Sequence, residues 1–260
     1  MRTYPLLALL CAAFPALAWG PEGHALVARI AETQLKPETR ARVAEILGPD
    51  STMTSMSSWP DEIRRSQPQT GPWHYVDIPI DKPGLDMARD CPNGNCVIGA
   101  IAAMRARLRD PALAADQRRE ALMYVIHFIG DMHQPLHCSN NNDRGGNEVH
   151  IVFQGQPGNL HSLWDSGLLA RMGKEDDLFP RFSAVSARRR KKFANGTVND
   201  WAEQTHKLAQ QMVYGKLPNA APGAPVAIGV DYERQADPLI ELQIERAGAR
   251  LAAVLNQDLR

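Results

Sequence analysis

Apolar residues recur every three to four positions through most of this 260-residue chain, and that spacing restricts the fold to a mainly helical one. The spacing predicts helices over residues 22–34, 37–47, 97–108, 116–133, 159–172, 197–214 and 234–257. Strand-like alternation is confined to residues 73–80 and 148–154, which is enough for a small β-ribbon. Residues 218–230 are rich in Pro, Gly and Ala and are expected to form a loop between helices. Since no internal repeat or domain linker interrupts the pattern, we predict a single-domain, mostly α helical bundle over residues 19–260.

The first 18 residues have the three parts of a secretory signal peptide. Arg2 supplies a positive charge, residues 6–17 form an apolar stretch too short to cross a bilayer, and residues 16–18 match a cleavage signal. A short buried helix is the alternative interpretation of this segment. Cleavage after residue 18 would leave Trp19 as the first residue of a secreted or periplasmic protein. No later segment is apolar for long enough to span a bilayer, so we expect no membrane association.

The chain carries equal numbers of basic and acidic residues, 29 Lys plus Arg and 29 Asp plus Glu, and so has no overall attraction for polyanions. An enzyme that acts on nucleic acid would then need a local source of positive potential, which bound metal ions can supply. The basic run at residues 188–192 is equally consistent with contact to a phosphate backbone and with a solvated loop.

The cysteines are consistent with export. Cys91 and Cys96 enclose a turn-forming Pro-Asn-Gly-Asn segment and can close a small disulfide in an oxidising compartment, although a reduced pair is the alternative. Cys138 is then the odd thiol, and we expect a partly buried free cysteine rather than an additional metal ligand.

Two His-x-x-x-Asp pairs carry the main functional signal of the sequence. His127 with Asp131, and His161 with Asp165, fall on predicted helices, so each pair projects from one helix face. A single pair of this kind is usually a surface ion pair. Two pairs in apolar surroundings, with His137 close by, instead indicate a metal site, because zinc binds imidazole and carboxylate groups that converge at about 2.0–2.2 Å.

Two shorter motifs upstream add candidate residues. Asp61 and Arg64 lie one helical turn apart in Trp-Pro-Asp-Glu-Ile-Arg. His74 and Asp77 lie in Trp-His-Tyr-Val-Asp, on the segment with strand-like alternation. Each motif by itself also has a purely structural interpretation, the first as a helix cap with a surface charge and the second as a half-buried histidine.

The N terminus left by signal cleavage would begin Trp19-Gly-Pro-Glu-Gly-His24. An α-amine has a pKa of about 7.7–8.0, so a metal ion displaces its proton at modest cost near neutral pH. The amine and carbonyl of Trp19 can together chelate one ion. Accurate signal cleavage would then be a condition of activity.

Six motifs occur in order along the chain: W-G-x-x-G-H, W-x-D-x-x-R, W-H-Y-V-D, H-F-x-G-D-x-H-Q-P-L-H, G-G-N and N-L-H-x-x-W-D. In order and spacing they resemble the motifs of the type I single-strand-specific zinc nucleases, the S-one/P-one nuclease family of fungi, plants and some bacteria. The resemblance covers essentially all of residues 19–260. It implies a phospholipase C/nuclease fold and a disulfide between Cys91 and Cys96.

The resemblance also implies three zinc ions per chain and divides the ligands among them. One ion would be held by Asp61, His74, His127 and Asp131. A second would be held by His137, His161 and Asp165. The third would be held by Trp19, His24 and Asp131, so that Asp131 bridges two ions. Arg64 would contact the phosphate, and the base beside the scissile phosphate would bind Tyr75, Asp77, Gly145 and Asn147.

These roles imply a hydrolytic mechanism. Zinc lowers the pKa of bound water from about 15.7 to roughly 7, and the resulting hydroxide, oriented by Asp61, would attack phosphorus in line. Single-stranded DNA and RNA would be cut to products with 5′-phosphates, and 3′-nucleotides would lose their phosphate by the same route. A base that stacks on Tyr75 must be unstacked from its neighbours, which favours single strands. We expect the enzyme to be a monomer.

Two other functions fit parts of the pattern. A zinc-dependent phospholipase C shares the N-terminal Trp chelate, but in that family the first His comes later and the last helical pair ends in Glu, where this chain has Asp165. A non-catalytic periplasmic zinc-binding protein would need the ligands but neither Arg64 nor a base pocket. Of the remaining histidines, His133 is expected in the core or behind the ligands, His150 on a strand surface, and His206 has no assigned role.

Overall fold

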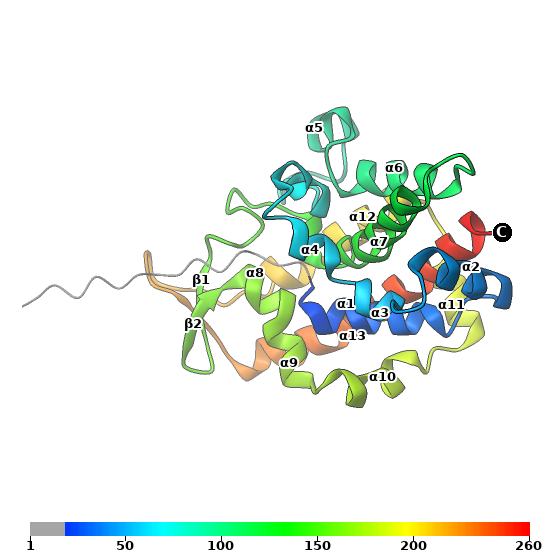
Figure 1. Ribbon diagram of the computed structural model, residues 1–260. Coiled ribbons are helices and arrows are strands. Elements are labelled where there is room, and N and C mark those ends of the chain that lie inside the picture. The colour runs from blue at the N-terminus through cyan, green and yellow to red at the C-terminus, as the bar shows by residue number, and fades with distance from the viewer. Residues whose placement is uncertain (1–18) are drawn as a thin grey trace, which may run out of the picture.

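The computed structural model describes residues 19–260, and the predicted signal peptide at residues 1–18 lies outside the described residues. Helices form most of the molecule, and one small sheet lies at the end opposite to the C terminus (Figure 1). The α-helices are α1 (Pro21–Glu32), α2 (Pro37–Leu47), α3 (Met53–Met56), α4 (Trp59–Ile63), α5 (Met87–Asp90), α6 (Val97–Arg109), α7 (Ala115–Asp131), α8 (Leu160–Ser162), α9 (Leu168–Met172), α10 (Glu175–Ser183), α11 (Ala187–Phe193), α12 (Val198–Leu208) and α13 (Val230–Asp258). The prediction of a mostly α fold is confirmed.

Short segments with tighter or wider turns connect several of these helices. The 3-10 segments are η1 (Pro68–His74), η2 (Pro92–Gly94) and η3 (Pro135–Cys138). The π-helical segments are η4 (Leu163–Gly167) and η5 (Ala209–Tyr214). The predicted helices over 159–172 and 197–214 are therefore real, but each changes to a π turn along its length. Within residues 19–260 no helix is both long and apolar enough to cross a membrane.

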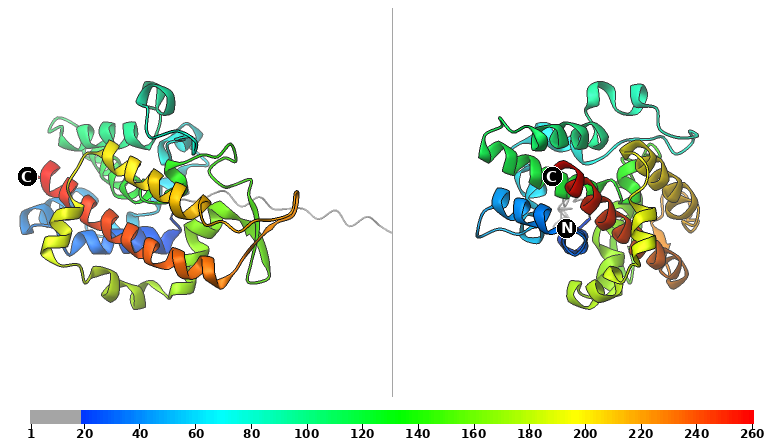
Figure 2. Two further views of the ribbon diagram at one scale, coloured as in Figure 1. Left: turned by 180° about the vertical axis from the view of Figure 1, so that it is seen from behind. Right: turned by 90° about the vertical axis from the view of Figure 1, so that its right-hand side faces the viewer.

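The core is formed where α1 and α7 pack against the long C-terminal helix α13, and α6 packs on the other side of α7 (Figure 2). Leu26, Ile30, Phe128 and Leu251 are fully buried there, and each such side chain contributes roughly 1.5–3 kcal/mol by leaving water. The backbones of α1 and α13 come close at Gly248, where a Cβ atom would lie 2.5 Å from Ile30 Cγ2. The predicted boundaries of these helices differ from the observed ones by at most four residues.

The sheet has three strands in the order β2–β1–β3. Strand β1 (His150–Phe153) pairs with β2 (Gln156–Asn159) as an antiparallel hairpin. A small ribbon is therefore present, but only β1 lies in a segment predicted to be a strand, and β2 was not predicted. Strand β3 (Val226–Ile228) pairs with β1 in parallel and lies inside the segment 218–230 that we expected to be a loop. Three residues are too few for a detectable alternation in a segment so rich in Pro and Gly.

Residues 73–80 do not form a strand, so that prediction was wrong. His74 ends the 3-10 segment η1, and the following residues are extended. They pair with the chain after η3 only through an isolated bridge between Pro79 and Asn140. Pro79 has no N–H and cannot extend a ladder. The alternation in the sequence is nevertheless real, because Val76 and Ile78 are buried whereas Tyr75 and Asp77 are exposed.

Candidate metal centre

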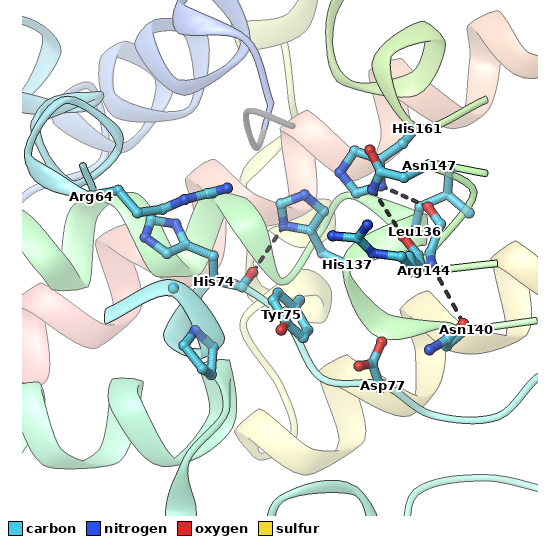
Figure 3. Close-up of a pocket in the computed structure, with 13 residues that line it drawn as sticks. Arg64, His74, Tyr75, Asp77, Leu136, His137, Asn140, Arg144, Asn147 and His161 are labelled. Atoms are coloured by element: carbon cyan, nitrogen blue, oxygen red, sulfur yellow. Dashed lines mark hydrogen bonds between the residues drawn. The ribbon is translucent and has the colours of Figure 1, made fainter. Parts of the chain in front are cut away.

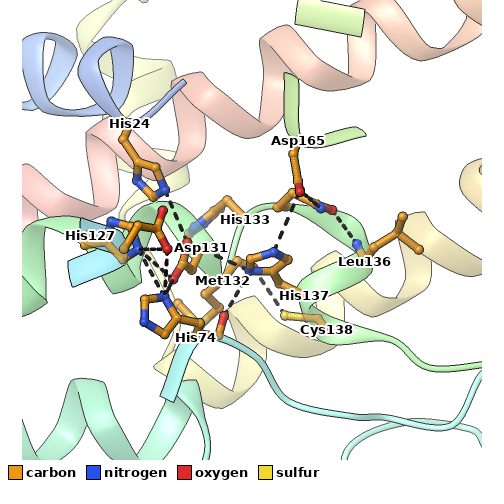
Figure 4. A network of polar contacts seen from close by, with 12 residues as sticks. His24, His74, His127, Asp131, Met132, His133, Leu136, His137, Cys138 and Asp165 are labelled. Carbon is orange, nitrogen blue, oxygen red and sulfur yellow. Dashed lines mark hydrogen bonds and ion pairs between the residues drawn. The ribbon is translucent and has the colours of Figure 1, made fainter. Parts of the chain in front are cut away.

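Histidine and aspartate side chains from elements far apart in the sequence meet where the C-terminal end of α7 reaches the interior (Figure 4). Their ligand atoms form three groups, each with all atoms within 4.8 Å of one another. The groups are His24, His127 and Asp131; Asp61, His74 and His127; and His137, His161 and Asp165. Every side chain predicted as a metal ligand, apart from Trp19, is therefore in one of them.

Local structure explains how α7 presents two of these side chains. His127 and Asp131 are one turn apart in its last turn, so they lie on one face. Gly130, which lies between them, leaves room for the side chain of His24. A Cβ atom at this position would lie 2.8 Å from His24 Nδ1. The helix ends at Asp131, and Pro135 then begins the 3-10 segment that carries His137.

The group around Asp131 has the geometry of a closed zinc site. Asp131 Oδ2 lies 3.0 Å from His74 Nδ1 and 3.2 Å from His127 Nε2, and these two nitrogens are 3.1 Å apart. Asp61 Oδ1 is 3.7 Å from each nitrogen. Ligands bonded tetrahedrally to zinc at about 2.0–2.2 Å lie roughly 3.3 Å from one another. The four atoms are thus spaced as ligands of one ion would be.

The other Asp131 oxygen faces a different histidine. Oδ1 lies 3.3 Å from His24 Nε2, and the His24 ring stacks on His127 with centroids 4.0 Å apart. In the third group His161 Nε2 is 3.4 Å from Asp165 Oδ2, and His137 Nε2 is 3.8 Å from Asp165 Oδ1. The chain at Asp165 is in the π segment η4, a backbone form that occurs frequently at functional sites.

Backbone carbonyls fix the orientation of three of these rings. The Nδ1–H groups of His127, His137 and His161 donate to the carbonyls of Ser57, His74 and Gly145 at 2.7, 2.9 and 2.6 Å. Each bond holds the tautomer in which the Nε2 lone pair faces the centre. Metal-ligating histidines characteristically use their other nitrogen in this way.

Unpaired polar atoms test whether the residues fit a bound cation. Among residues 19–260 the buried side-chain atoms without a hydrogen-bond partner include Asp61 Oδ1, Asp131 Oδ1, Asp165 Oδ2, His74 Nε2 and both ring nitrogens of His24. Buried polar atoms are otherwise nearly always hydrogen-bonded, so a concentration of unpaired polar atoms at one place calls for a ligand. The donor set of imidazoles and carboxylates suits zinc.

The proton equilibria of the histidines agree with this fit. Burial lowers the pKa values of His24, His137 and His161, and that of His137 lies well below its usual range. These rings are therefore neutral, as metal ligands must be. His127 differs, because burial is outweighed by Asp131 and Asp61, which raise its pKa to about 9.

The carboxylates create a demand for positive charge. Burial and the negative charges of Asp61 and Asp131 hold the pKa of Asp165 well above its usual range, despite a hydrogen bond from Gln134. Three acidic groups with largely neutral imidazoles form a site of net negative potential. A bound divalent cation would neutralise it and would favour the ionised form of Asp165.

A cavity of about 340 Å³ opens beside the centre and contains the predicted substrate residues (Figure 3). Its lining includes three candidate ligands, His74, His137 and His161, so a molecule in the cavity reaches the metal centre directly. The rest of the lining is Arg64, Gly71, Pro72, Tyr75, Asp77, Leu136, Asn140, Arg144, Gly145 and Asn147. Every predicted base-pocket residue is among them.

Two polar residues of this cavity were missed by sequence reasoning. Asn140 hydrogen-bonds the Asp77 carboxylate, a contact that opposes the rise in its pKa caused by burial. Arg144 directly precedes Gly145 and Gly146, and its position next to that glycine pair was the available signal. No pattern based on helix or strand periodicity could find either residue, since both lie in irregular backbone.

The remaining predictions have clear structural outcomes. Cys91 and Cys96 form a disulfide, and Cys138 is a buried free cysteine. His133 uses both ring nitrogens, with Nδ1 2.6 Å from the Ile129 carbonyl and Nε2 2.7 Å from Arg250, so it lies behind the centre and not in it. His150 is exposed on β1, as expected for a strand surface.

Trp19, a predicted ligand, and His206, to which no role was assigned, are both fully buried. The N–H of Gly20, the residue after Trp19, donates to the Asp165 carbonyl at 2.8 Å. The backbone that follows Trp19 therefore lies against the segment that carries a candidate ligand. His206 Nδ1 lies 2.8 Å from Ser139 Oγ.

Comparison with known proteins identifies the family. The family described as S1/P1 Nuclease matches residues 19–260. Endonuclease 4 of Arabidopsis thaliana is 33% identical over 272 residues, which cover 93% of this chain and 89% of the relative. Nuclease P1 of Penicillium citrinum is 39% identical over 157 residues, 57% of each chain, and Nuclease S1 of Aspergillus oryzae is 34% identical over 176 residues, 63% of this chain and 61% of the relative. This chain therefore belongs to the S1/P1 nuclease family of hydrolytic nucleases.

Proposed function

We propose that this protein is a secreted, zinc-dependent endonuclease that hydrolyses phosphodiester bonds in single-stranded DNA and RNA. Its products would carry 5′-phosphates, and it would also remove the phosphate of 3′-nucleotides. The observation that carries the proposal is the meeting of three His/Asp groups beside a cavity that also contains Arg64 and an exposed aromatic ring, that of Tyr75. Membership of a nuclease family supports the same reaction class.

The proposed ligand sets follow the groups in the structure, with one addition. The first zinc ion would be held by Asp61, His74, His127 and Asp131. The second would be held by His137, His161 and Asp165. The third would be held by His24, Asp131 and the amine and carbonyl of Trp19. Support for the bridging role of Asp131 comes from its two oxygens, which face His24 on one side and His74 with His127 on the other.

Bound zinc would supply a nucleophile at neutral pH and Lewis-acid stabilisation of phosphoryl oxygens. The chain's own groups would then orient the reactants. Asp61 would bind the first zinc ion through Oδ1, which has no hydrogen-bond partner among residues 19–260, and its other carboxylate oxygen would orient a water molecule for in-line attack on phosphorus. The Arg64 guanidinium, 3.8 Å from Asp61 Oδ1, would stabilise the negative charge that develops on the phosphoryl group.

The cavity gives a physical reason for a preference for single strands. Tyr75 is 40% exposed and offers a ring face to one base, and such stacking is worth about 1–3 kcal/mol per base. Asp77 and Asn147 would hydrogen-bond the edge of the same base. A base held in this way must leave its stack, which costs more in a duplex than in a single strand.

Removal of residues 1–18 as a signal peptide would create the free amine of Trp19. The contact between Gly20 and the Asp165 carbonyl supports a role for this end of the chain, because it brings the backbone beside Trp19 to the metal centre. Secretion, the monomeric state and the count of three zinc ions are parts of the same proposal.

The decisive experiment pairs metal content with activity of the protein that begins at Trp19. We expect about three zinc ions per chain, and chelation should abolish release of 5′-phosphorylated products from a single-stranded oligonucleotide. The matched control carries one extra residue before Trp19 and should retain two ions but lose the third. Fewer than two ions per chain, or full cleavage after chelation, would contradict the proposal. Three ions without nuclease activity would direct the assay to phospholipid substrates.

A further inference from the structure

Arg144 extends into the cavity from the side opposite to Arg64, and the two guanidinium groups point toward one another in Figure 3. The Arg144 side chain is exposed, and among residues 19–260 it has neither an ion-pair nor a hydrogen-bond partner. An arginine that forms no ion pair in a substrate cavity is positioned to bind an anion from solution. Its planar group offers paired donors that match the geometry of a phosphate.

The backbone that holds Arg144 is unusual for a non-glycine residue. Its φ is 55°, in the left-handed region, and Gly145 and Gly146 continue with φ of 62° and 83°. Non-glycine residues adopt this conformation at a cost of about 1–3 kcal/mol, and they do so mainly where the surroundings enforce it. Such strain at a cavity wall suggests that the direction of the Arg144 side chain matters for function.

The enforcing contacts come from the neighbouring residues. The buried Asp143 carboxylate accepts hydrogen bonds from Tyr214 Oη at 2.9 and 3.0 Å and from the Gly146 N–H at 2.8 Å. The Arg144 carbonyl accepts from the Asn147 side-chain amide at 2.8 Å. The loop is therefore anchored on both sides of Arg144, and its side chain is aimed by a fixed backbone.

The two arginines act on different parts of the site. Arg64 lies near the metal centre, where its Nη1 atom is 3.8 Å from Asp61 Oδ1. Arg144 acts together with Arg64 on the Tyr75 hydroxyl, where both oppose the rise in pKa that burial and Asp77 cause. Arg144 is on the same loop as Gly145 and Asn147, two of the proposed base-pocket residues, which places it at the end of the cavity that would hold the base.

We propose that Arg144 binds a second, non-scissile phosphate of the substrate, the 5′-phosphate of the nucleotide whose base stacks on Tyr75. The inference rests on the proposed function. Each nucleoside in a strand lies between two phosphates. If the 3′-phosphate is at the metal centre with Arg64 and the base is on Tyr75, the 5′-phosphate is the nearest remaining anion. Arg144 would then distinguish a nucleotide within a strand from an isolated 3′-nucleotide.

The test compares two substrates that differ only in this phosphate, a nucleoside 3′-monophosphate and the matching nucleoside 3′,5′-bisphosphate. The charge is removed by Arg144→Asn, because asparagine tolerates the left-handed conformation and should preserve the loop. We expect KM for the bisphosphate to rise about tenfold, a change equivalent to about 1.4 kcal/mol. KM for the monophosphate and kcat for both substrates should stay within about twofold of the unaltered protein.

Two further variants make the result specific. Arg144→Lys keeps the charge without the paired donors and should recover part of the affinity for the bisphosphate. Arg109→Gln removes one positive charge at the end of α6, far from the cavity in sequence and outside its lining, and should change neither KM. In binding of a longer single strand, Arg144→Asn should reduce the slope of log affinity against log salt by about 0.7, the value for one lost phosphate contact.

Equal loss of activity on both substrates would overturn the inference, because it would mean that Arg144 contacts the scissile phosphate or supports the fold. No change on either substrate would overturn it as well. If the unaltered protein hydrolyses neither substrate nor an oligonucleotide, the proposed function itself fails. Binding of the single strand, measured by fluorescence anisotropy, would then still decide the inference, and identical salt slopes for the unaltered and Arg144→Asn proteins would refute it.

Discussion

At the metal centre the polar side chains are buried at helix ends, and backbone carbonyls hold them. On the loop of residues 139–147, by contrast, the side chains that reach the cavity come from irregular, partly left-handed backbone. Asp131 is fully buried, but Arg144 is exposed. The difference shows how the protein separates two tasks. Helix ends fix ligand atoms to within tenths of an ångström, as a metal requires, while the loop presents groups that can adapt to a flexible strand.

The largest effect is expected from Asp131→Asn, which should disrupt the metal centre and leave the structure of the 139–147 loop unchanged. Loss of the bridging charge should lower zinc content and reduce the cleavage rate by at least about 1,000-fold, since metal ions contribute several kcal/mol to such reactions. Zinc per chain and initial rates on a single-stranded oligonucleotide measure the effect. His150→Asn, on the exposed surface of β1, is the control and should be neutral. Full zinc content with normal rates would contradict the assigned role of Asp131.

Gly130→Ala tests how tightly the centre is packed. The added methyl group would lie 2.8 Å from His24 Nδ1, so either the ring or α1 must move. We expect a loss of about 1–3 kcal/mol in the free energy of unfolding and release of the zinc ion nearest His24. Thermal unfolding and zinc stoichiometry report the two effects. Gly84→Ala, where the nearest atom would be 3.6 Å away, is the matched control. A variant with unchanged metal content would show that His24 has room to move.

Tyr75→Ala tests the substrate cavity rather than the metal centre. Removal of the ring should raise KM for oligonucleotides about 5- to 150-fold, as loss of a stacking contact worth about 1–3 kcal/mol implies. Zinc content should not change, because Tyr75 is in none of the three ligand groups. Tyr75→Phe keeps the stacking face and should retain most of the affinity. Should Tyr75→Ala lose zinc, the two regions would not be separable.

The smallest effect is expected from Tyr214→Phe, which removes one hydroxyl behind the 139–147 loop. Asp143 would lose a donor, so stability should fall by about 1 kcal/mol and KM for oligonucleotides should rise a few-fold as Arg144 becomes less well held. Tyr232→Phe removes a comparable buried hydroxyl, which bonds the Val213 carbonyl, and should reduce stability without a change in KM. Identical KM values for the two variants would show that the anchor does not position the loop.

Sequence patterns predicted which side chains meet at the candidate metal centre, because helix periodicity makes some contacts visible in the chain. His127 with Asp131, and His161 with Asp165, could be paired from their spacing alone. Helix periodicity could not predict which distant segments come together, since nothing in the local sequence relates His24 to Asp131. There the resemblance of the motif order to a known family supplied what periodicity could not.

The cavity wall was harder to predict for a physical reason. Arg144 is aimed by a left-handed backbone and by Asp143, whose partner Tyr214 is 71 residues away in the sequence. Likewise β3 forms only because Val226 and Ile228 meet β1, and a three-residue strand has too short a pattern to be recognised. In both cases tertiary contacts decide the local structure, so sequence reasoning restricted to periodicity and turns could not find them.

The candidate ligand atoms of the centre come from α1, α4, η1, α7, η3, α8 and η4, which together span the chain from His24 to Asp165. Unfolding of any one of these elements would remove at least one candidate ligand. Metal retention would then report on the integrity of the whole molecule. Unfolding of the chain should release all of the bound zinc, and a nascent chain could not acquire its full complement of ions until Asp165 had reached the compartment in which the protein folds.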